Sequence, residues 1–137
     1  MAASAATTAQ KPYPIFTVDQ FQIAMKTVGL AFGLVNSSLA SNDVASSKDY
    51  LARSRDQLAT TIVFWRDRKR DDAIKMLRDA VSRMDDLDVA LSTEPVDPAA
   101  VTALAKQVGA ACESCHAVYR EQDPATKAYR LKPGVEP

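Results

Sequence analysis

Both cysteines of the chain and its single histidine lie within five consecutive positions, as Cys112, Cys115 and His116. On a helix these positions are three and four residues apart and share one face, so a single object can contact all three side chains. Four chemistries use such residues: a disulfide, a thiol redox pair, a metal site and covalent attachment of a haem.

The spacing favours covalent haem over the other three. A disulfide between Cys112 and Cys115 would close a very short loop and constrain the unfolded chain little. A thioredoxin-like pair usually follows a strand, and we predict no strand here. A structural zinc site needs four ligands, and an iron–sulfur cluster needs more thiolates than the chain has. In Cys-x-x-Cys-His, by contrast, two thiols form thioethers with the haem vinyl groups and the histidine binds the iron, so we expect one haem c held by Cys112, Cys115 and His116.

Four amphipathic stretches predict the elements that position this motif. Apolar residues at helical spacing predict helices over 17–41, 47–68, 71–92 and 98–122, and Thr17 and Gln20 have capping-box spacing at the first start. The short connections predict an all-α, antiparallel up-down-up-down four-helix bundle, with the haem near the C-terminal end of the fourth helix. The predicted stripes are Phe21, Met25, Val28, Phe32 and Val35; Tyr50, Leu51, Leu58, Ile62 and Trp65; Ile74, Leu77, Val81, Met84, Leu87 and Leu91; and Val101, Leu104, Ala105, Val108 and Cys112.

Two glycines, Gly29 and Gly33, fall inside the first predicted helix, where each lowers the helix propensity. Either a bulky group approaches the helix closely at these positions, or the helix packs tightly against a neighbour. The sequence leaves both interpretations open.

Length and composition describe one domain with two flanking segments. The chain has 137 residues, enough for a core in the bundle at 17–122. We expect residues 1–16 to form a flexible arm and 123–137 an irregular tail. Lys plus Arg and Asp plus Glu both number 17, which gives no support for a nucleic-acid partner. No apolar run approaches the roughly 20 residues that cross a bilayer, so we expect no membrane insertion.

The start of the chain, MAASAATTAQK, lacks the basic and apolar regions of a signal peptide. It looks like the small-residue stretch that follows one. We therefore expect that the native signal was trimmed or replaced.

The segment ACESCHAVYR resembles the haem motif of the cytochrome c′ family, the four-helix-bundle c-type cytochromes. Tyr119 and Arg120 match the aromatic and basic positions that follow the histidine in that family. In FQIAM, Gln22 and Met25 match the family's first-helix pattern Arg-Gln-x-x-Met. Phe21 stands where many members have Arg, so the partner of the haem propionates is unassigned.

The resemblance implies a function that depends on the sixth iron ligand. If Met25 binds the iron opposite His116, as in the low-spin members, the protein is an electron carrier. The alternative is a five-coordinate haem that binds NO or CO, with Met25 only crowding the distal pocket. Arg120 would pack across the proximal side of the haem and Tyr119 beside it.

The resemblance also implies partners and a location: transient redox partner proteins, a homodimer through the first two helices, and the periplasm. We do not expect an enzyme. Peroxide cleavage needs a distal acid–base group, and the chain has no second histidine.

Overall fold

A computed structural model describes residues 17–135 of the chain, and most of this range is helical. The helices are α1 (Val18–Ala40), α2 (Val44–Thr60), α3 (Ile62–Asp67), α4 (Asp71–Leu91) and α5 (Pro98–Tyr119). Two short strands follow, β2 (Arg120–Gln122) and β3 (Tyr129–Leu131). The predicted arm at 1–16 lies outside the described residues.

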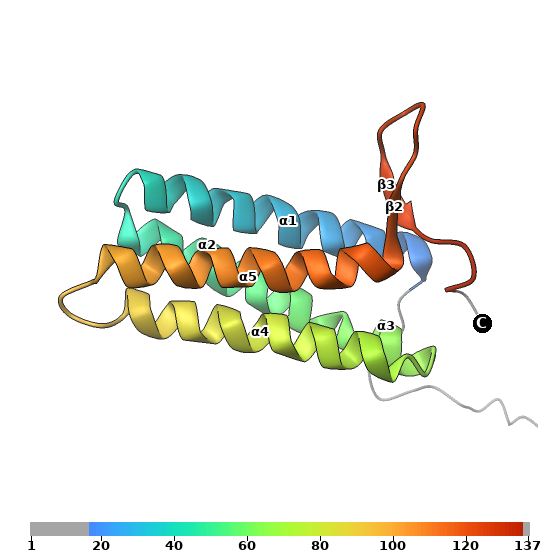
Figure 1. Ribbon diagram of the computed structural model, residues 1–137, viewed down its shortest axis with the longest axis horizontal. Helices are drawn as coiled ribbons and strands as arrows, with labels where there is room; N and C mark the ends of the chain where they lie inside the picture. The colour runs from blue at the N-terminus through green and yellow to red at the C-terminus, as the bar shows by residue number, and fades with distance from the viewer. Residues whose placement is uncertain (1–16, 136–137) are drawn as a thin grey trace, which may run out of the picture.

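The four long helices lie side by side along one axis (Figure 1). The connections 41–43 and 92–97 lie at one end of the molecule, and α3 lies at the other end together with the two strands. Helix α1 packs on α2, α2 on α4 and α4 on α5. The predicted helical class, with four helices packed against each other, is therefore confirmed.

Side-chain caps determine where the helices begin. The predicted capping box is present: Gln20 N donates to Thr17 Oγ1 at 3.1 Å, and Thr17 N donates to Gln20 Oε1 at 2.9 Å. Helix α5 begins at Pro98, and the carboxylate of Asp97 accepts from Ala99 N at 3.0 Å. Proline at this position is favourable, because its missing N–H would have no partner in the first turn.

The predicted second helix is interrupted at Thr61, which divides it into α2 and α3. Thr61 is fully buried, and its hydroxyl donates to the carbonyl oxygen of Leu58 at 2.6 Å. Such a local bond competes with continuation of the helix. The hydrophobic pattern continues through the break because α3 also buries Phe64 and Trp65, so the sequence did not reveal it.

Buried aromatic rings fill the end of the bundle at α3. Phe21 stacks on Phe64 with ring centroids 4.1 Å apart. Trp65 meets Phe21 and Phe64 edge-on, at 5.2 and 5.0 Å. Tyr119, the last residue of α5, lies 4.6 Å from Trp65. This aromatic cluster joins α1, α3 and α5 at one level.

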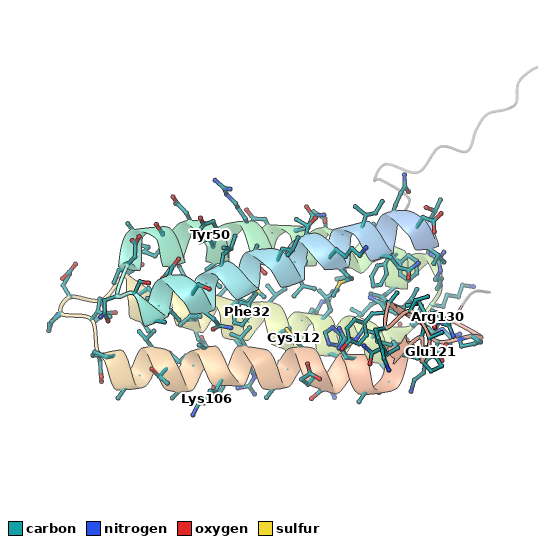
Figure 2. All side chains as sticks on the ribbon, turned by 90° about the horizontal axis from the view of Figure 1, so that it is seen from above. Phe32, Tyr50, Lys106, Cys112, Glu121 and Arg130 are labelled. Carbon is teal, nitrogen blue, oxygen red and sulfur yellow. The ribbon has the colours of Figure 1, made fainter. Side chains whose placement is uncertain are left out.

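The tail differs from the prediction, because α5 ends at Tyr119 and not at 122, and part of 123–137 is ordered as a strand. Arg120 is extended, and β2 pairs antiparallel with β3. Arg130 forms ion pairs with Glu121 at 2.7 Å and with Asp123 at 3.0 Å, at the end of the molecule shown in Figure 2. Arg130 lies nine positions after Glu121 and seven after Asp123, so the helical pattern of the sequence did not predict these pairs.

Helix α1 has apolar side chains on three sides. One side packs in the core, and a second side, with Met25 and Phe32, is half-buried. The third side exposes Ile23, Leu30 and Leu34, an outward stripe that no other part of the described chain covers. By length and composition α1 could cross a membrane, contrary to the premise of the sequence analysis. Core helices of proteins and signal sequences share this length and composition.

Candidate functional site

The three motif residues lie on the last two turns of α5. Both cysteines are free thiols and are half-buried. The His116 side chain is 23% exposed. Cys112 and Cys115 pack against the edge of the core, so neither lies on the outer surface of the helix. The sequence-predicted grouping of two thiols and one imidazole is therefore present on one element.

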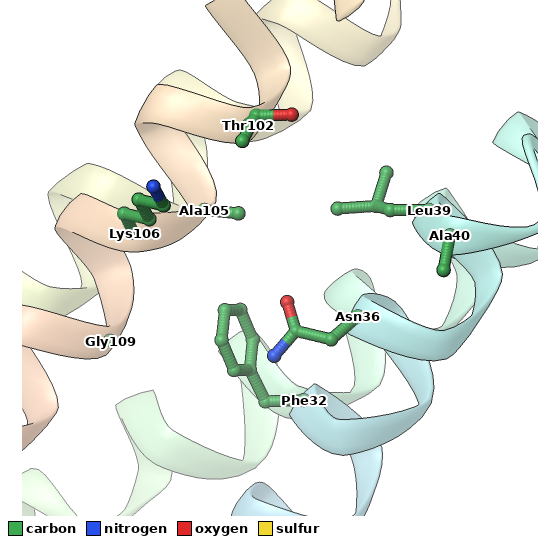
Figure 3. Close-up of a pocket in the computed structure, with 8 residues that line it drawn as sticks. All are labelled: Phe32, Asn36, Leu39, Ala40, Thr102, Ala105, Lys106 and Gly109. Carbon is green, nitrogen blue, oxygen red and sulfur yellow. The ribbon is translucent and has the colours of Figure 1, made fainter. Parts of the chain in front are cut away.

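A groove separates α1 from α5 (Figure 3). Its volume is about 440 Å³, within the range of small-molecule and cofactor sites. Figure 3 shows side chains from the two helices facing each other across it. The lining residues are Phe32, Asn36, Leu39 and Ala40 from α1 and Thr102, Ala105, Lys106 and Gly109 from α5.

The groove fixes which residues of the two helices lie level with each other. Leu39 lies opposite Thr102, and Phe32 lies near Gly109 (Figure 3). Seven residues are two helical turns, about 10 Å, and return to the same face. Met25 precedes Phe32 by seven residues, and His116 follows Gly109 by seven. Met25 and His116 are therefore placed at the same level on the two facing stripes.

Apolar side chains along these stripes are only half-buried. They contact the core at one edge and leave the other edge uncovered, and they are Met25, Phe32 and Leu39 on α1 and Leu104, Ala105, Cys112 and Cys115 on α5. Burial of such surface is favourable by about 25 cal/mol per Å². An apolar group inserted between α1 and α5 would complete that burial.

The glycines point to the same conclusion. A Cβ added at Gly29, Gly33 or Gly109 would meet no atom within 4 Å. Tight packing between helices of the chain, one of the two interpretations left open by the sequence, is therefore wrong for Gly29 and Gly33. Close approach by a group other than this chain stays a prediction.

Burial keeps both thiols protonated at neutral pH. It raises the pKa of Cys112. Burial, followed by the charges of Cys112 and Asp72, raises the pKa of Cys115 to about 11. Reactive redox cysteines have lowered pKa values, because the thiolate is the nucleophile. The electrostatics therefore disfavour a thiol redox pair.

His116 is neutral at physiological pH, the form that binds a metal. Burial and the charge of Arg120 lower the pKa of His116, and the nearby Glu113 offsets part of that effect. The buried Nδ1 has no hydrogen-bond partner within residues 17–135, and Glu113 Oε1 lies 3.7 Å away.

Tyr119 is buried at the end of α5, whereas Arg120 follows the helix in an extended conformation. Tyr119 is 7% exposed, and its hydroxyl donates to the carboxylate of Asp72 at 2.7 Å. Arg120 leaves the helix and places its guanidinium 3.8 Å from the ring centre of Tyr129. The predicted packing of Arg120 across the proximal side of a haem is not tested by this contact.

Sequence analysis missed Asp72 and the groove residues Asn36 and Lys106. Asp72 is 47 positions before Tyr119, and no local pattern connects the two. Asn36 and Lys106 lie beside apolar stripes and look like ordinary surface positions in the sequence. Only the packing of α1 near α5 and of α4 beside α5 brings them to the site.

The residues present fit a haem. Two free thiols lie one turn apart, a neutral imidazole follows directly, and the groove lined by α1 and α5 reaches Gly109, one turn before Cys112. Residues 17–135 contain no group of three or more His, Cys, Asp or Glu side chains that could hold a metal ion by themselves. Cys112 and Cys115 would hold the porphyrin, and His116 would bind its iron.

Replacing Tyr119 by Phe should reduce the free energy of unfolding of the purified protein by about 1 kcal/mol near neutral pH, because a hydrogen bond to an exposed carboxylate is lost. Burial and the bond to Asp72 raise the pKa of Tyr119 to about 12, against an ordinary value near 10. The unfolded state therefore loses this proton first, and wild-type stability should fall as the pH rises from about 10 toward 12.

Urea unfolding at a series of alkaline pH values measures both effects. Tyr119→Phe should weaken the alkaline loss of stability. The control Tyr129→Phe alters an exposed ring and should change neither quantity. An equal alkaline loss in wild type and Tyr119→Phe would contradict the assignment.

No family model matches the sequence, and neither the curated proteins nor the solved structures gave a match.

Proposed function

We propose that this chain is a monohaem c-type cytochrome that transfers single electrons. In this proposal the four helices form an antiparallel up-down-up-down bundle around one haem c. The observation that carries it is the grouping of two free, half-buried thiols and one imidazole on a single face of α5, next to the groove between α1 and α5. Counting two helical turns from the groove residues Phe32 and Gly109 predicts that Met25 and His116 face each other beyond its end. This proposal agrees with the resemblance of the segment ACESCHAVYR to the haem motif of the cytochrome c′ family.

Cys112 and Cys115 would each hold the haem through one thioether. Each thiol would add its S–H bond across a vinyl group, with sulfur bonding to one vinyl carbon and hydrogen to the other, so no oxidant would be consumed. Burial raises the pKa of both thiols, so the protons that this addition needs are present at neutral pH. Both cysteines are on the helix face that also carries His116.

The remaining residues define the environment of the iron. A haem supplies an iron that gains and loses one electron. His116 would bind the iron through an imidazole nitrogen and Met25 through its thioether, a combination that raises the reduction potential. Phe32 and Leu39 line the groove and would help to keep water away from a bound haem, which lowers the cost of reorganisation around the charge. Trp65 and Tyr119 pack the end of the bundle beyond the motif.

A second function is supported by the open volume beside Phe32 and by the uncovered Gly29 and Gly109. If Met25 does not bind the iron, this space admits a diatomic ligand. The protein would then bind NO or CO at a five-coordinate haem.

Mass spectrometry of the protein made in a host that matures c-type cytochromes in its periplasm tests the proposal. The denatured wild-type chain should carry one haem. Cys112→Ala/Cys115→Ala should release all its haem into acidified solvent, because no thioether can form. A wild-type chain without a tetrapyrrole adduct would refute the proposed function.

Met25→Ala distinguishes the two functions in the haem-loaded protein. If Met25 is the sixth ligand, the oxidised spectrum should change from low-spin to high-spin, the sulfur–iron charge-transfer band should disappear and the potential should fall. The matched control is Met76→Ala, another half-buried methionine, which should leave the spectrum unchanged. A high-spin wild-type spectrum that Met25→Ala does not alter would favour the gas-binding function.

We also propose that two copies associate through the outward stripe of α1, formed by Ile23, Leu30 and Leu34. Leu30 is 73% exposed and Ile23 65% exposed, large values for neighbouring apolar residues on one helix. Such a patch marks an interaction surface. The dimer belongs in the periplasm, where this type of haem attachment is completed, and meets redox partners only transiently.

Leu30→Glu should weaken self-association at least about tenfold, because burial of a leucine contributes about 1.5–3 kcal/mol. Sedimentation velocity over a range of concentrations measures the change. The control Val89→Glu alters a side chain on α4 that is 65% exposed, and should leave the association unchanged. Wild-type protein that stays monomeric at high concentration would exclude the dimer.

A further inference from the structure

The charges of the chain are divided between the two ends of the bundle. Residues 17–26, 62–76 and 113–135 form the motif end, and they carry ten Lys or Arg against seven Asp or Glu. Residues 27–61 and 77–112 form the opposite half, with six basic and nine acidic residues. A chain with no net charge therefore has an excess of three positive charges at one end and three negative charges at the other.

Four charged residues, Lys26, Lys75, Arg78 and Glu113, lie within two positions of this boundary, so a small shift of the boundary changes the excess by one or two charges. Figure 1 shows the α3 segment and the hairpin of β2 and β3 at the same end as the last turn of α5. The positive excess and the haem motif therefore share one end.

Several acidic groups of the motif end already have partners. Arg130 binds Glu121 and Asp123, and Asp72 accepts the Tyr119 hydroxyl. In contrast, the side chains of Arg66 and Lys69 are exposed and form no hydrogen bond or ion pair with residues 17–135. These two cations are free to bind a partner.

The free cations are close to the motif through packed side chains. Arg66 follows Trp65, whose ring lies 4.6 Å from Tyr119, and Tyr119 lies one turn after Cys115. Arg70 donates to the carbonyl oxygen of Gly134 at 2.9 Å, which fixes the segment 66–70 against the tail. The basic surface is therefore rigidly connected to the end of the helix that carries the motif.

We infer that this basic end, centred on Arg66 and Lys69, is the docking surface for an acidic redox partner protein. The inference rests on the proposed electron-transfer function and names the chemistry of its partner. Opposite charges on the two ends orient the molecule, so a partner with an acidic face meets the motif end first. The acidic far end repels the same partner.

The test uses small oxidants of opposite charge in place of the partner. Reduced, haem-loaded protein is mixed with hexacyanoferrate(III), an anion, or with tris(phenanthroline)cobalt(III), a cation. In each case one electron moves from the ferrous protein to the oxidant, which becomes hexacyanoferrate(II) or the cobalt(II) complex, and no bond forms or breaks. Stopped-flow absorbance gives the second-order rate constants at ionic strengths from about 0.01 to 0.3 M.

The two propionates of a bound haem add the same negative charge to the wild type and to every variant, so the test compares the salt dependence of the variants with that of the wild type. If the electron leaves through the basic end, the rate with the anion should fall about tenfold as salt rises, and the rate with the cation should rise. Arg66→Glu/Lys69→Glu should remove or reverse both trends. The control Lys48→Glu/Arg53→Glu makes the same change in charge on α2, within the opposite half, and should have a smaller effect.

Rates that do not depend on salt, or equal effects of the two double variants, would overturn the inference. Failure of the proposed function can be told apart from failure of this inference. Protein without a haem absorption band refutes the cytochrome function, and the docking surface with it, before any rate is measured. Co-sedimentation with phosphatidylglycerol vesicles at physiological salt, lost in Arg66→Glu/Lys69→Glu, would assign the surface to a membrane and overturn the assignment to an acidic protein.

Discussion

The structure depends on two apolar walls that face each other without closing. Helix α1 packs on α2, and α5 packs on α4, while a groove of about 440 Å³ separates α1 from α5. Interiors of proteins are close-packed, and uncovered apolar surface is costly. The half-buried side chains and the glycines with open space beside them leave room between α1 and α5 for an apolar group.

The end of the bundle near α3 supplies the rigidity that an attached group needs. Phe21, Phe64, Trp65 and Tyr119 contact one another in a chain of rings from three helices. The interruption at Thr61 makes this possible, because it turns α3 so that its aromatic residues enter the core. The hydrogen bond from Tyr119 to Asp72 then ties the last turn of α5 to the first turn of α4.

Electrostatics act at two scales. Inside the site, burial favours uncharged thiols and an uncharged imidazole, which suits covalent attachment and metal binding better than disulfide exchange. Over the whole molecule, the balanced composition conceals a separation of charge between the ends. The net charge shows that the chain is not strongly basic. Encounters with partners depend on where the charged residues lie, and the arrangement of the helices decides that.

The sequence by itself determined the helical class, the capping box at Thr17 and the grouping of Cys112, Cys115 and His116, because each depends on neighbours within about one helical turn. Only the tertiary structure decided the break at Thr61, the hairpin after Tyr119, the bond to Asp72 and the groove between α1 and α5. These features depend on contacts between residues far apart in the chain. Helical periodicity shows which face of a helix is apolar, but it does not say which partner covers that face, or whether any part of the chain does.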